Sequence, residues 1–376
     1  MTIDRQFSIL VFTRDLDRYS LMMLRELQQM GQTVHVVIEP QTSANAKDWT
    51  KEIHVVAQVK LKGRFDKAAA QRYSDLVAHY QADICLCYTS RALSVALTAK
   101  RHFKFKTPIV GTRGAIGGVS AFYLQDWFTY LSPRLNAVVC MSQAIANKLS
   151  QEARRLYPKH PGRFEVIYPG YGQLLQTHPW PVARDRQATE VVRLLCIAND
   201  RPIKGLAVLL QAVAHHLPAE NWQLDIVGEC GPAVRAQVSQ SAVLSQHVHV
   251  HGYRNDVPEF LKLAHIYIQP TLKPGEGIGN SMAEAMSYGL PVITSNVGGG
   301  IELVNHEQSG LHFSAENPAA LGDAIHRLME QPALCDQLGQ QGALRLQERF
   351  SLRQEAQSFW TLFKSLRDSS PHPSDH

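Results

Sequence analysis

Two glutamates, Glu276 and Glu284, lie in a glycine-rich stretch and are the residues best suited to do chemistry. The stretch covers residues 269–307 and reads QPTLKPGEGIGNSMAEAMSYGLPVITSNVGGGIELVNHE. Its periodicity predicts a strand that ends near residue 268, a glycine-broken loop, a helix at 281–288 and a second buried strand at 290–294. The glycines lie where the loop meets the helix N-terminus. Free backbone N–H groups and a positive dipole end at such a junction suit an anion such as a phosphate.

Other interpretations of this stretch compete with anion binding. The spacing Gly275-x-Gly277 resembles a dinucleotide fingerprint, but Asn280 occupies the position of the third glycine. The sequence GNSMA is one residue away from a nucleophile elbow, yet its Ser281 is better suited to cap a helix. Ser281 and Glu284 together have the spacing of a capping box, so the spacing leaves Glu284 open between capping and ligand binding. Glu276 caps nothing evident.

The elements that position these residues alternate between strands and helices along most of the chain. The pattern opens with a strand at 8–13, a helix at 16–30 and a strand at 33–38, and it includes an expected helix at 122–131. A segment rich in proline and glycine interrupts the alternation after residue 168, and the alternation restarts with a strand at 192–197. This rhythm predicts parallel sheets with helices on both faces.

The predicted fold is therefore α/β, with two doubly wound Rossmann-like domains facing a cleft, where ligands of such sheets bind. We place the first domain at residues 1–170, a linker at 171–190 and the second domain at 191–350. A C-terminal helix at 351–367 is expected to pack back on the first domain. Residues 368–376 are expected to be a disordered tail.

Composition and charge narrow the class of protein. Hydrophobic residues make up 45% of the chain and charged residues 19%, as in a globular enzyme. No apolar run approaches the roughly 20 residues that span a bilayer, and the N-terminus lacks the features of a secretory signal. The spacing of the six cysteines resembles no metal site, so we expect reduced, buried thiols in a cytoplasmic protein.

The net charge of +5 is concentrated in two basic clusters. One cluster lies at residues 100–106, where two phenylalanines separate the cations, and the other lies at residues 154–163. Each is either a solvated face or a surface that meets anionic lipid headgroups or an acidic acceptor. We expect no nucleic-acid partner, because no binding module surrounds these charges.

The segment EGIGNSMAEAMSYGLPVITSNVGGGIELV resembles the motif of family 4 retaining glycosyltransferases of the GT-B fold, whose core is a glutamate, seven residues and a second glutamate. Further similarity lies in RPIKGLAVLLQA (201–212), LDIVGECGP (224–232), VHGYRNDVPEFLKLAHIYIQP (250–270) and RFSLRQEAQSFWTLF near the C-terminus. In the first half of the chain only the strand–helix rhythm and SPRLNAVVCMSQAI (132–145) agree. The similarity therefore covers most of the second domain.

The resemblance implies a role for each matching position. Glu276 would hold donor-sugar hydroxyls, and Glu284 would bind the ribose of the nucleotide. Lys204 would neutralise the diphosphate, and no metal or cofactor is implied, because the nucleotide sugar is itself the substrate. The backbone beside Glu276 and the loops that line the nucleobase complete the implied donor site, with Gly277, Ile278, Gly279, Asn280, Gly228, Tyr253 and Arg254.

Three departures from the family pattern concern other positions. The loop after the first strand (13–20) contains no glycine. The family's partner arginine falls at Asn199, and Arg201 is the candidate to replace it. The family's histidine in the first domain falls at Arg113, which could contact a phosphate or an acidic acceptor but is a poor base, because arginine stays protonated.

The resemblance implies a retaining, metal-independent transferase that moves a sugar from a nucleoside-diphosphate sugar to a glycan or lipid-linked acceptor. Envelope polysaccharide or lipopolysaccharide synthesis is the expected setting, in the cytoplasm or at the inner face of a membrane. Two alternatives stay open: a GT-B relative with another activity, such as an epimerase, and a catalytically silent protein that binds nucleotide sugars.

Overall fold

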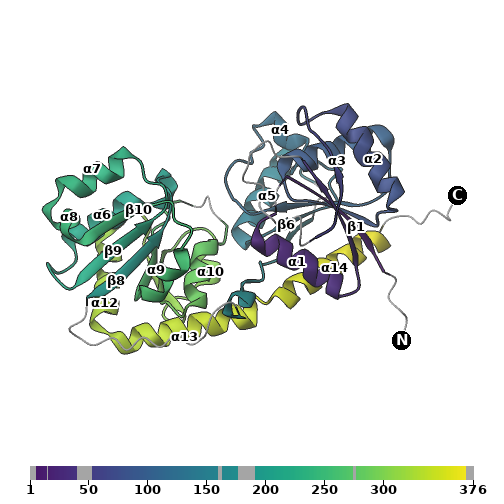
Figure 1. Cartoon of the computed structure of the whole chain (residues 1–376). Helices are drawn as coiled ribbons and strands as arrows, with labels where there is room; N and C mark the ends of the chain where they lie inside the picture. The colour runs from purple at the N-terminus through teal and green to yellow at the C-terminus, as the bar shows by residue number, and fades with distance from the viewer. Residues whose placement is uncertain are drawn as a thin grey trace. The chain divides into compact units, whose positions relative to one another are not determined.

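The computed structural model describes residues 6–14, 16–39, 53–159, 163–176, 191–273 and 277–369. These residues form two units, each built on its own parallel sheet (Figure 1). The first unit comprises Met1–Gly170 and Leu352–His376, and the second comprises Tyr171–Ser351. The chain therefore leaves the first unit once and returns to it with its last helix. The two-unit parallel α/β fold class predicted from the sequence is confirmed.

The first unit has a seven-stranded sheet in the order β3-β2-β1-β4-β5-β6-β7, with all neighbours parallel. Alternate residues of each strand point to opposite faces, and both faces are buried. One face packs on α2, α3 and α5, and the other packs on α1 and α14. The elements are β1 (Ser8–Thr13), α1 (Arg18–Gln29), β2 (Thr33–Ile38), β3 (Val55–Gln58), α2 (Lys67–His79), β4 (Ile84–Cys87), α3 (Ser90–Phe103), β5 (Ile109–Arg113), α4 (Leu124–Trp127), β6 (Ala137–Cys140), α5 (Gln143–Leu156), β7 (Arg163–Val166) and α14 (Leu352–Asp368).

The second unit has a six-stranded sheet in the order β10-β9-β8-β11-β12-β13, again with parallel neighbours. Helices α6 and α12 contribute to the core on one face. The elements are η2 (Tyr171–Gln176), β8 (Val192–Ile197), η3 (Pro202–Lys204), α6 (Leu206–His215), β9 (Trp222–Val227), α7 (Pro232–Gln240), α8 (Ala242–His247), β10 (Val248–Gly252), α9 (Val257–Leu263), β11 (Ile266–Gln269), α10 (Asn280–Ser287), β12 (Val292–Ser295), α11 (Gly300–Leu303), β13 (Gly310–Phe313), α12 (Pro318–Glu330) and α13 (Pro332–Arg349).

The last helix, α14, lies against α1 at the first unit (Figure 1). Phe7 and Trp360 form an edge-to-face ring pair there, with centroids 4.4 Å apart. Of the predicted linker, residues 171–176 form the short helix η2, which packs on α10 and α13 of the second unit. Residues 177–190 and most of the predicted tail lie outside the described residues.

Three strands were missed by the sequence analysis, and one predicted helix was wrong. The sequence did not indicate β3, β7 and β13, which are four-residue edge strands without a continuous apolar run. The helix expected at 122–131 is reduced to the single turn α4, because side-chain hydrogen bonds curl this segment into a loop. All six cysteines are free and buried, as expected. Among the described residues, no helix is long and apolar enough to cross a membrane.

Candidate functional site

The strand order of the second unit brings two loops together. Strand β8 comes first in the chain and lies at the centre of the sheet, between β9 and β11. The chain therefore leaves the carboxyl ends of β8 and β11 in opposite directions, and the loops after these two strands flank the resulting crevice. The loop after β8 contains Lys204, and the loop after β11 leads to Glu276 and α10. Two stretches that are far apart in the sequence thus meet at one edge of the sheet.

The turn that contains Lys204 is fixed against the loop after β11. The N–H of Leu272 donates to the carbonyl of Ile203 at 2.9 Å. Gly205 has a φ of +70°, and a Cβ at this position would lie 1.8 Å from the carbonyl oxygen of Pro270. Only glycine adopts this conformation without strain and also allows the two backbones to approach so closely. The structure therefore places the predicted Lys204 beside the loop that leads to Glu276.

Glu276 itself lies outside the described residues, but the segment that follows it is described. Gly279 is the N-cap of α10, and the first hydrogen bond of this helix runs from the N–H of Met282 to the carbonyl of Gly279 at 3.1 Å. The N–H groups of Asn280 and Ser281 precede that bond. They form the positive end of the helix and can donate to an anion.

Ser281 is not the N-cap of α10, so the capping box with Glu284 is wrong. The Ser281 hydroxyl instead accepts from the hydroxyl of Tyr267 at 2.8 Å. Glu284 lies one turn further along α10 and is half-buried. Burial raises the pKa of Tyr267 well above its ordinary value, and the negative charge of Glu284 raises it further. The loss of the capping box removes one structural explanation for Glu284, and its ribose-binding role stays a prediction.

Two contacts that position α10 were not found from the sequence. A Cβ on Gly299, in the loop after β12, would lie 2.5 Å from the carbonyl carbon of Gly277, so the two loops touch through their backbones. The buried Tyr171 of η2 donates its hydroxyl proton to Asn280 Oδ1 at 2.7 Å. The glycine triplet at 298–300 was a visible signal for the first contact. Nothing in the sequence indicated the second.

The residues predicted to line the nucleobase lie at the ends of β9 and β10. Gly228 has a φ of +139° and donates its N–H to the carbonyl of Gly252 at 2.8 Å. Tyr253 follows directly and exposes 75% of its surface. Arg254 forms a two-pronged ion pair with Asp256, with N–O distances of 2.8 and 2.6 Å. Tyr253 is thus available for stacking, whereas Arg254 would have to leave Asp256 to contact a ligand.

Arg201 and Arg113 are the candidates for the family's arginine and histidine positions, and each has a structural partner. The Nε of Arg201 donates to Asn199 Oδ1 at 3.0 Å, so the residue at the expected arginine position contacts the candidate. In the first unit, Arg113 ends β5 and donates from Nε to the carbonyl of Ala115 at 2.8 Å and from Nη2 to the carbonyl of Gly117. Its guanidinium also lies over the ring of Tyr130. These contacts hold the loop after β5, and the catalytic role of Arg113 stays a prediction.

Comparison with known proteins finds a glycosyltransferase family match in each of the two units. The family described as Glycosyltransferase Family 4 matches residues 16–171, and the family described as Glycosyl transferases group 1 matches residues 192–331. The D-rhamnosyltransferase WbpZ of Pseudomonas aeruginosa is 31% identical over 155 residues, which are 40% of this chain and 39% of that protein. The lipopolysaccharide core biosynthesis mannosyltransferase LpsB of Rhizobium meliloti is 26% identical over 180 residues, 46% of this chain and 51% of that protein.

The chain spans 39% and 51% of the lengths of these two relatives. The whole fold is matched by the crystal structure of Alr3699/HepE from Anabaena in complex with UDP, with a TM-score of 0.77 and 20% identity over 96% of this chain and 100% of that chain. The two family matches together cover most of both parallel-sheet units. This chain belongs to the family 4 glycosyltransferases and has their GT-B fold.

Proposed function

We propose that this chain transfers a sugar from a nucleoside-diphosphate sugar to a glycan or lipid-linked acceptor. The observation that carries the proposal is the junction between the Lys204 turn and the loop that enters α10. A leaving diphosphate develops negative charge, and a lysine beside the amides of a helix N-terminus can stabilise that charge. Both groups lie at the crevice where parallel sheets of this kind bind ligands.

The remaining donor contacts follow from the family resemblance and the placement of the loops. Glu276 would hold the sugar hydroxyls, and Glu284 would bind the ribose. Gly228 and Tyr253 would line the nucleobase, because close backbone approach and an exposed ring suit a flat ligand. The related fold of HepE was crystallised with UDP, which supports a nucleoside diphosphate as the ligand.

We infer a retaining reaction without a protein nucleophile. The bond between the anomeric carbon and the diphosphate oxygen breaks, and the acceptor oxygen bonds to the same face of that carbon. The departing phosphate takes the proton of the acceptor hydroxyl. Positive charge from Lys204, Arg201 and the α10 amides would take the place of a divalent metal, so we propose that neither a metal nor an organic cofactor takes part.

The proposed setting is the synthesis of envelope polysaccharide or lipopolysaccharide, in the cytoplasm at the inner face of a membrane. The similarity to LpsB, a lipopolysaccharide core biosynthesis mannosyltransferase, supports this setting. A lipid-linked acceptor would also explain why the chain exposes cations that match an anionic surface.

Thermal shift with UDP, GDP, ADP and CMP tests the donor site, because a ligand that binds only the folded state raises the melting temperature. We expect one nucleoside diphosphate to give a clear shift. Lys204→Met should weaken that ligand at least tenfold, equivalent to about 1.4 kcal/mol. The control Lys262→Met, on α9, removes the same charge outside the proposed site and should leave the affinity unchanged.

Product analysis separates the proposed reaction from its alternatives. With the correct donor, transfer should continue in EDTA and the product should keep the donor's anomeric configuration by NMR. An epimerase would instead convert the donor sugar without an acceptor, and a silent binding protein would turn over nothing. Transfer that Glu276→Ala leaves unchanged would remove the role assigned to Glu276, and a strict metal requirement would remove the metal-independent mechanism.

A further inference from the structure

The segment from Phe122 to Phe128 in the first unit reverses the usual burial pattern. Its apolar side chains point outward: Phe122 exposes 87% of its surface and Leu124 exposes 63%, with Tyr123, Trp127 and Phe128 also exposed. Its acid points inward, and Asp126 exposes only 3%. Large apolar side chains gathered on a surface mark a contact with a partner or a membrane, whereas single ones need no explanation.

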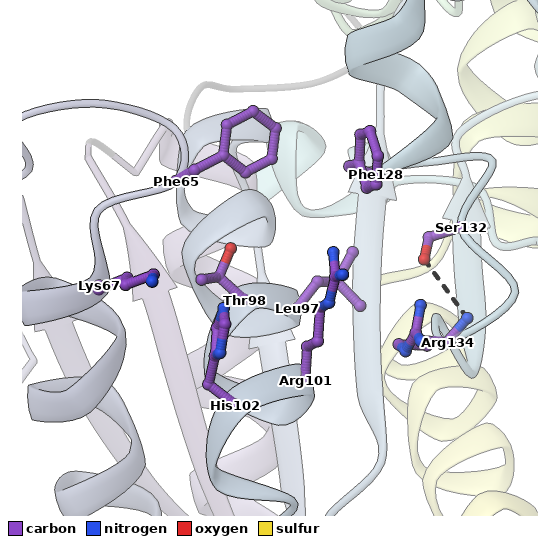
Figure 2. A pocket seen from close by; sticks show the side chains of 9 residues that line it. All are labelled: Phe65, Lys67, Leu97, Thr98, Arg101, His102, Phe128, Ser132 and Arg134. Atoms are coloured by element: carbon purple, nitrogen blue, oxygen red, sulfur yellow. Dashed lines mark hydrogen bonds between the residues drawn. The ribbon is translucent and has the colours of Figure 1, made fainter.

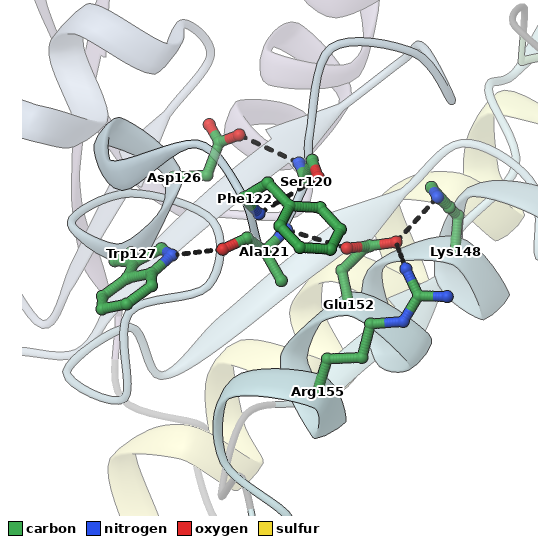
Figure 3. Close-up of polar contacts among 8 residues, drawn as sticks. All are labelled: Ser120, Ala121, Phe122, Asp126, Trp127, Lys148, Glu152 and Arg155. Atoms are coloured by element: carbon green, nitrogen blue, oxygen red, sulfur yellow. Dashed lines mark hydrogen bonds and ion pairs between the residues drawn. The ribbon is translucent and has the colours of Figure 1, made fainter.

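Buried carboxylates hold this segment in place (Figure 3). Asp126 accepts from the N–H of Ser120 at 3.0 Å, and the indole of Trp127 donates to the carbonyl of Ala121 at 2.7 Å. The N–H of Ala121 in turn donates to Glu152 of α5 at 2.8 Å. Burying carboxylates is costly unless they are paired and hydrogen-bonded. Hydrogen bonds to buried carboxylates therefore fix the conformation in which the segment exposes its apolar side chains.

Glu152 is itself fully buried and held by two cations (Figure 3). Lys148 lies 2.8 Å from its carboxylate and Arg155 lies 2.7 Å away. Burial alone would raise the pKa of Glu152, but the Ala121 N–H and these two cations lower it below its ordinary value. Glu152 is thus an anionic anchor for the start of the exposed segment.

A cationic cavity of about 250 Å³ adjoins the end of the segment (Figure 2). Phe128 belongs to both features, and its ring packs edge-on against Phe65 with centroids 5.7 Å apart. Lys67, Arg101 and Arg134 also line the cavity. Within the part of the chain that the structure describes, none of these three cations forms an ion pair. The volume lies below the roughly 300–1,000 Å³ of pockets for drug-sized ligands, so the cavity suits a small anionic group.

The basic cluster at residues 100–106 is divided by the structure. Lys100 turns inward, where its Nζ donates to the carbonyl of Thr107 at 3.1 Å and to Asn136 Oδ1 at 2.9 Å. Burial lowers the pKa of Lys100. Arg101 instead faces the cavity beside the aromatic rings. Of these two cations, Arg101 and not Lys100 is available for a surface contact.

We propose that the Phe122–Phe128 segment and the cationic cavity beside Phe128 form one docking surface for an anionic lipid membrane, with a lipid phosphate in the cavity. Aromatic and apolar side chains flanked by unpaired arginine and lysine match the two layers of a membrane interface, acyl chains and anionic headgroups. A neutral apolar partner would leave three cations unpaired, and a free phosphate would leave the aromatic segment in water. This proposal rests on the placement at the membrane that is part of the proposed function, and it does not depend on sugar transfer.

Sedimentation with vesicles tests this surface without any nucleotide sugar. The full chain is mixed with phosphatidylcholine vesicles and with vesicles that also contain phosphatidylglycerol, and the pelleted fraction is measured. The apolar variant carries Phe122→Ser, Tyr123→Ser and Leu124→Ser, and its control Leu263→Ser removes a 58%-exposed leucine from α9. The charge variant carries Arg101→Ser and Arg134→Ser, and its control is the exposed Arg353→Ser. Circular dichroism melting checks that each variant is folded.

The wild type should bind the anionic vesicles and bind neutral vesicles weakly. The apolar variant should lose at least tenfold in partitioning, the charge variant roughly fivefold per cation removed, and both controls should keep wild-type binding. Addition of inorganic phosphate at constant ionic strength should not displace the protein, whereas displacement would identify a free-phosphate site and overturn the docking surface. Unchanged vesicle binding by the folded apolar variant would also overturn it. Vesicle binding by a chain that transfers no sugar would refute the proposed function and leave the surface standing.

Discussion

The buried carboxyl of Glu355, on α14, predicts how the free energy of unfolding of the first unit depends on pH. It lies inside this unit and accepts from the N–H of Gly170 at 2.8 Å. Gly170 is the last residue of the unit before the chain enters the second unit, and a Cβ there would lie 2.4 Å from the Cα of Leu352. Glu355 thus joins the point where the chain leaves the unit to the helix with which it returns.

Burial raises the pKa of Glu355 from its ordinary 4.5 to about 8, with the Gly170 hydrogen bond opposing the shift and the charge of Asp17 adding to it. The folded state therefore prefers the protonated acid. Protonated Glu355 therefore contributes to the free energy of unfolding fully below about pH 4.5, and this contribution is lost as pH rises through about 8. Since one pKa unit corresponds to about 1.4 kcal/mol, the loss amounts to roughly 5 kcal/mol across that window.

Glu355→Gln should remove this dependence, because glutamine stays neutral and its carbonyl oxygen can still accept from Gly170. The free energy of unfolding of the first unit is measured by urea denaturation between pH 5 and pH 9. Wild type and variant should have similar stability at pH 5, and the variant should become progressively more stable above it, by several kcal/mol near pH 8. The control Glu26→Gln, on α1, should show no such divergence. Parallel stability curves for wild type and Glu355→Gln would refute the protonated, buried carboxyl.

Three further substitutions probe close contacts. Gly205→Ala forces a side chain against a carbonyl oxygen at a positive φ, so the affinity for the nucleoside diphosphate, measured by calorimetry, should fall at least tenfold. Gly63→Ala is the control, because Gly63 has open space around it, and it should leave this affinity unchanged. Equal losses of affinity in the two variants would contradict the reasoning. Gly299→Ala should likewise reduce the nucleotide-induced thermal shift by displacing the loop that enters α10, and an unchanged shift would show that the loop tolerates the displacement. Lys100→Met removes the hydrogen bonds to the carbonyl of Thr107 and to Asn136 Oδ1, and it should destabilise the first unit by about 1–3 kcal/mol in urea. Lys104→Met should be near neutral, and a neutral Lys100→Met would contradict an internal role.

The fold was predictable because both sheets consist largely of buried parallel strands. Such strands are short, continuous apolar runs, as in residues 8–13 and 192–197, and they alternate with amphipathic helices. Edge strands β3 and β7 have no fully buried residue and carry polar residues, so their apolar runs were too weak to detect. Fully buried residues therefore distinguish the strands that were predicted from most of those that were missed.

The sequence indicated the proposed donor site only through stretches that carry a local pattern of their own. The glycine loop before α10 and the lysine turn before α6 each carry their own local pattern. The contact that joins them, Gly205 against Pro270, has no such pattern, because it depends on the strand order of the sheet. Topology brings this glycine opposite another backbone, and no spacing along the chain indicates that.

The exposed segment at 122–128 shows why hydrophobic periodicity misled at one place. Periodicity detects a strip of apolar side chains but does not say what the strip faces. A helix packed on a core was the ordinary interpretation, yet the buried Asp126 and the Glu152 anchor turn the acid inward and the rings outward. An inward acid removes the polar face that would have made the segment an ordinary surface helix. The described residues of the first unit leave the apolar strip exposed, and the cations beside Phe128 favour an anionic partner. An anionic membrane would match both the apolar strip and the cations.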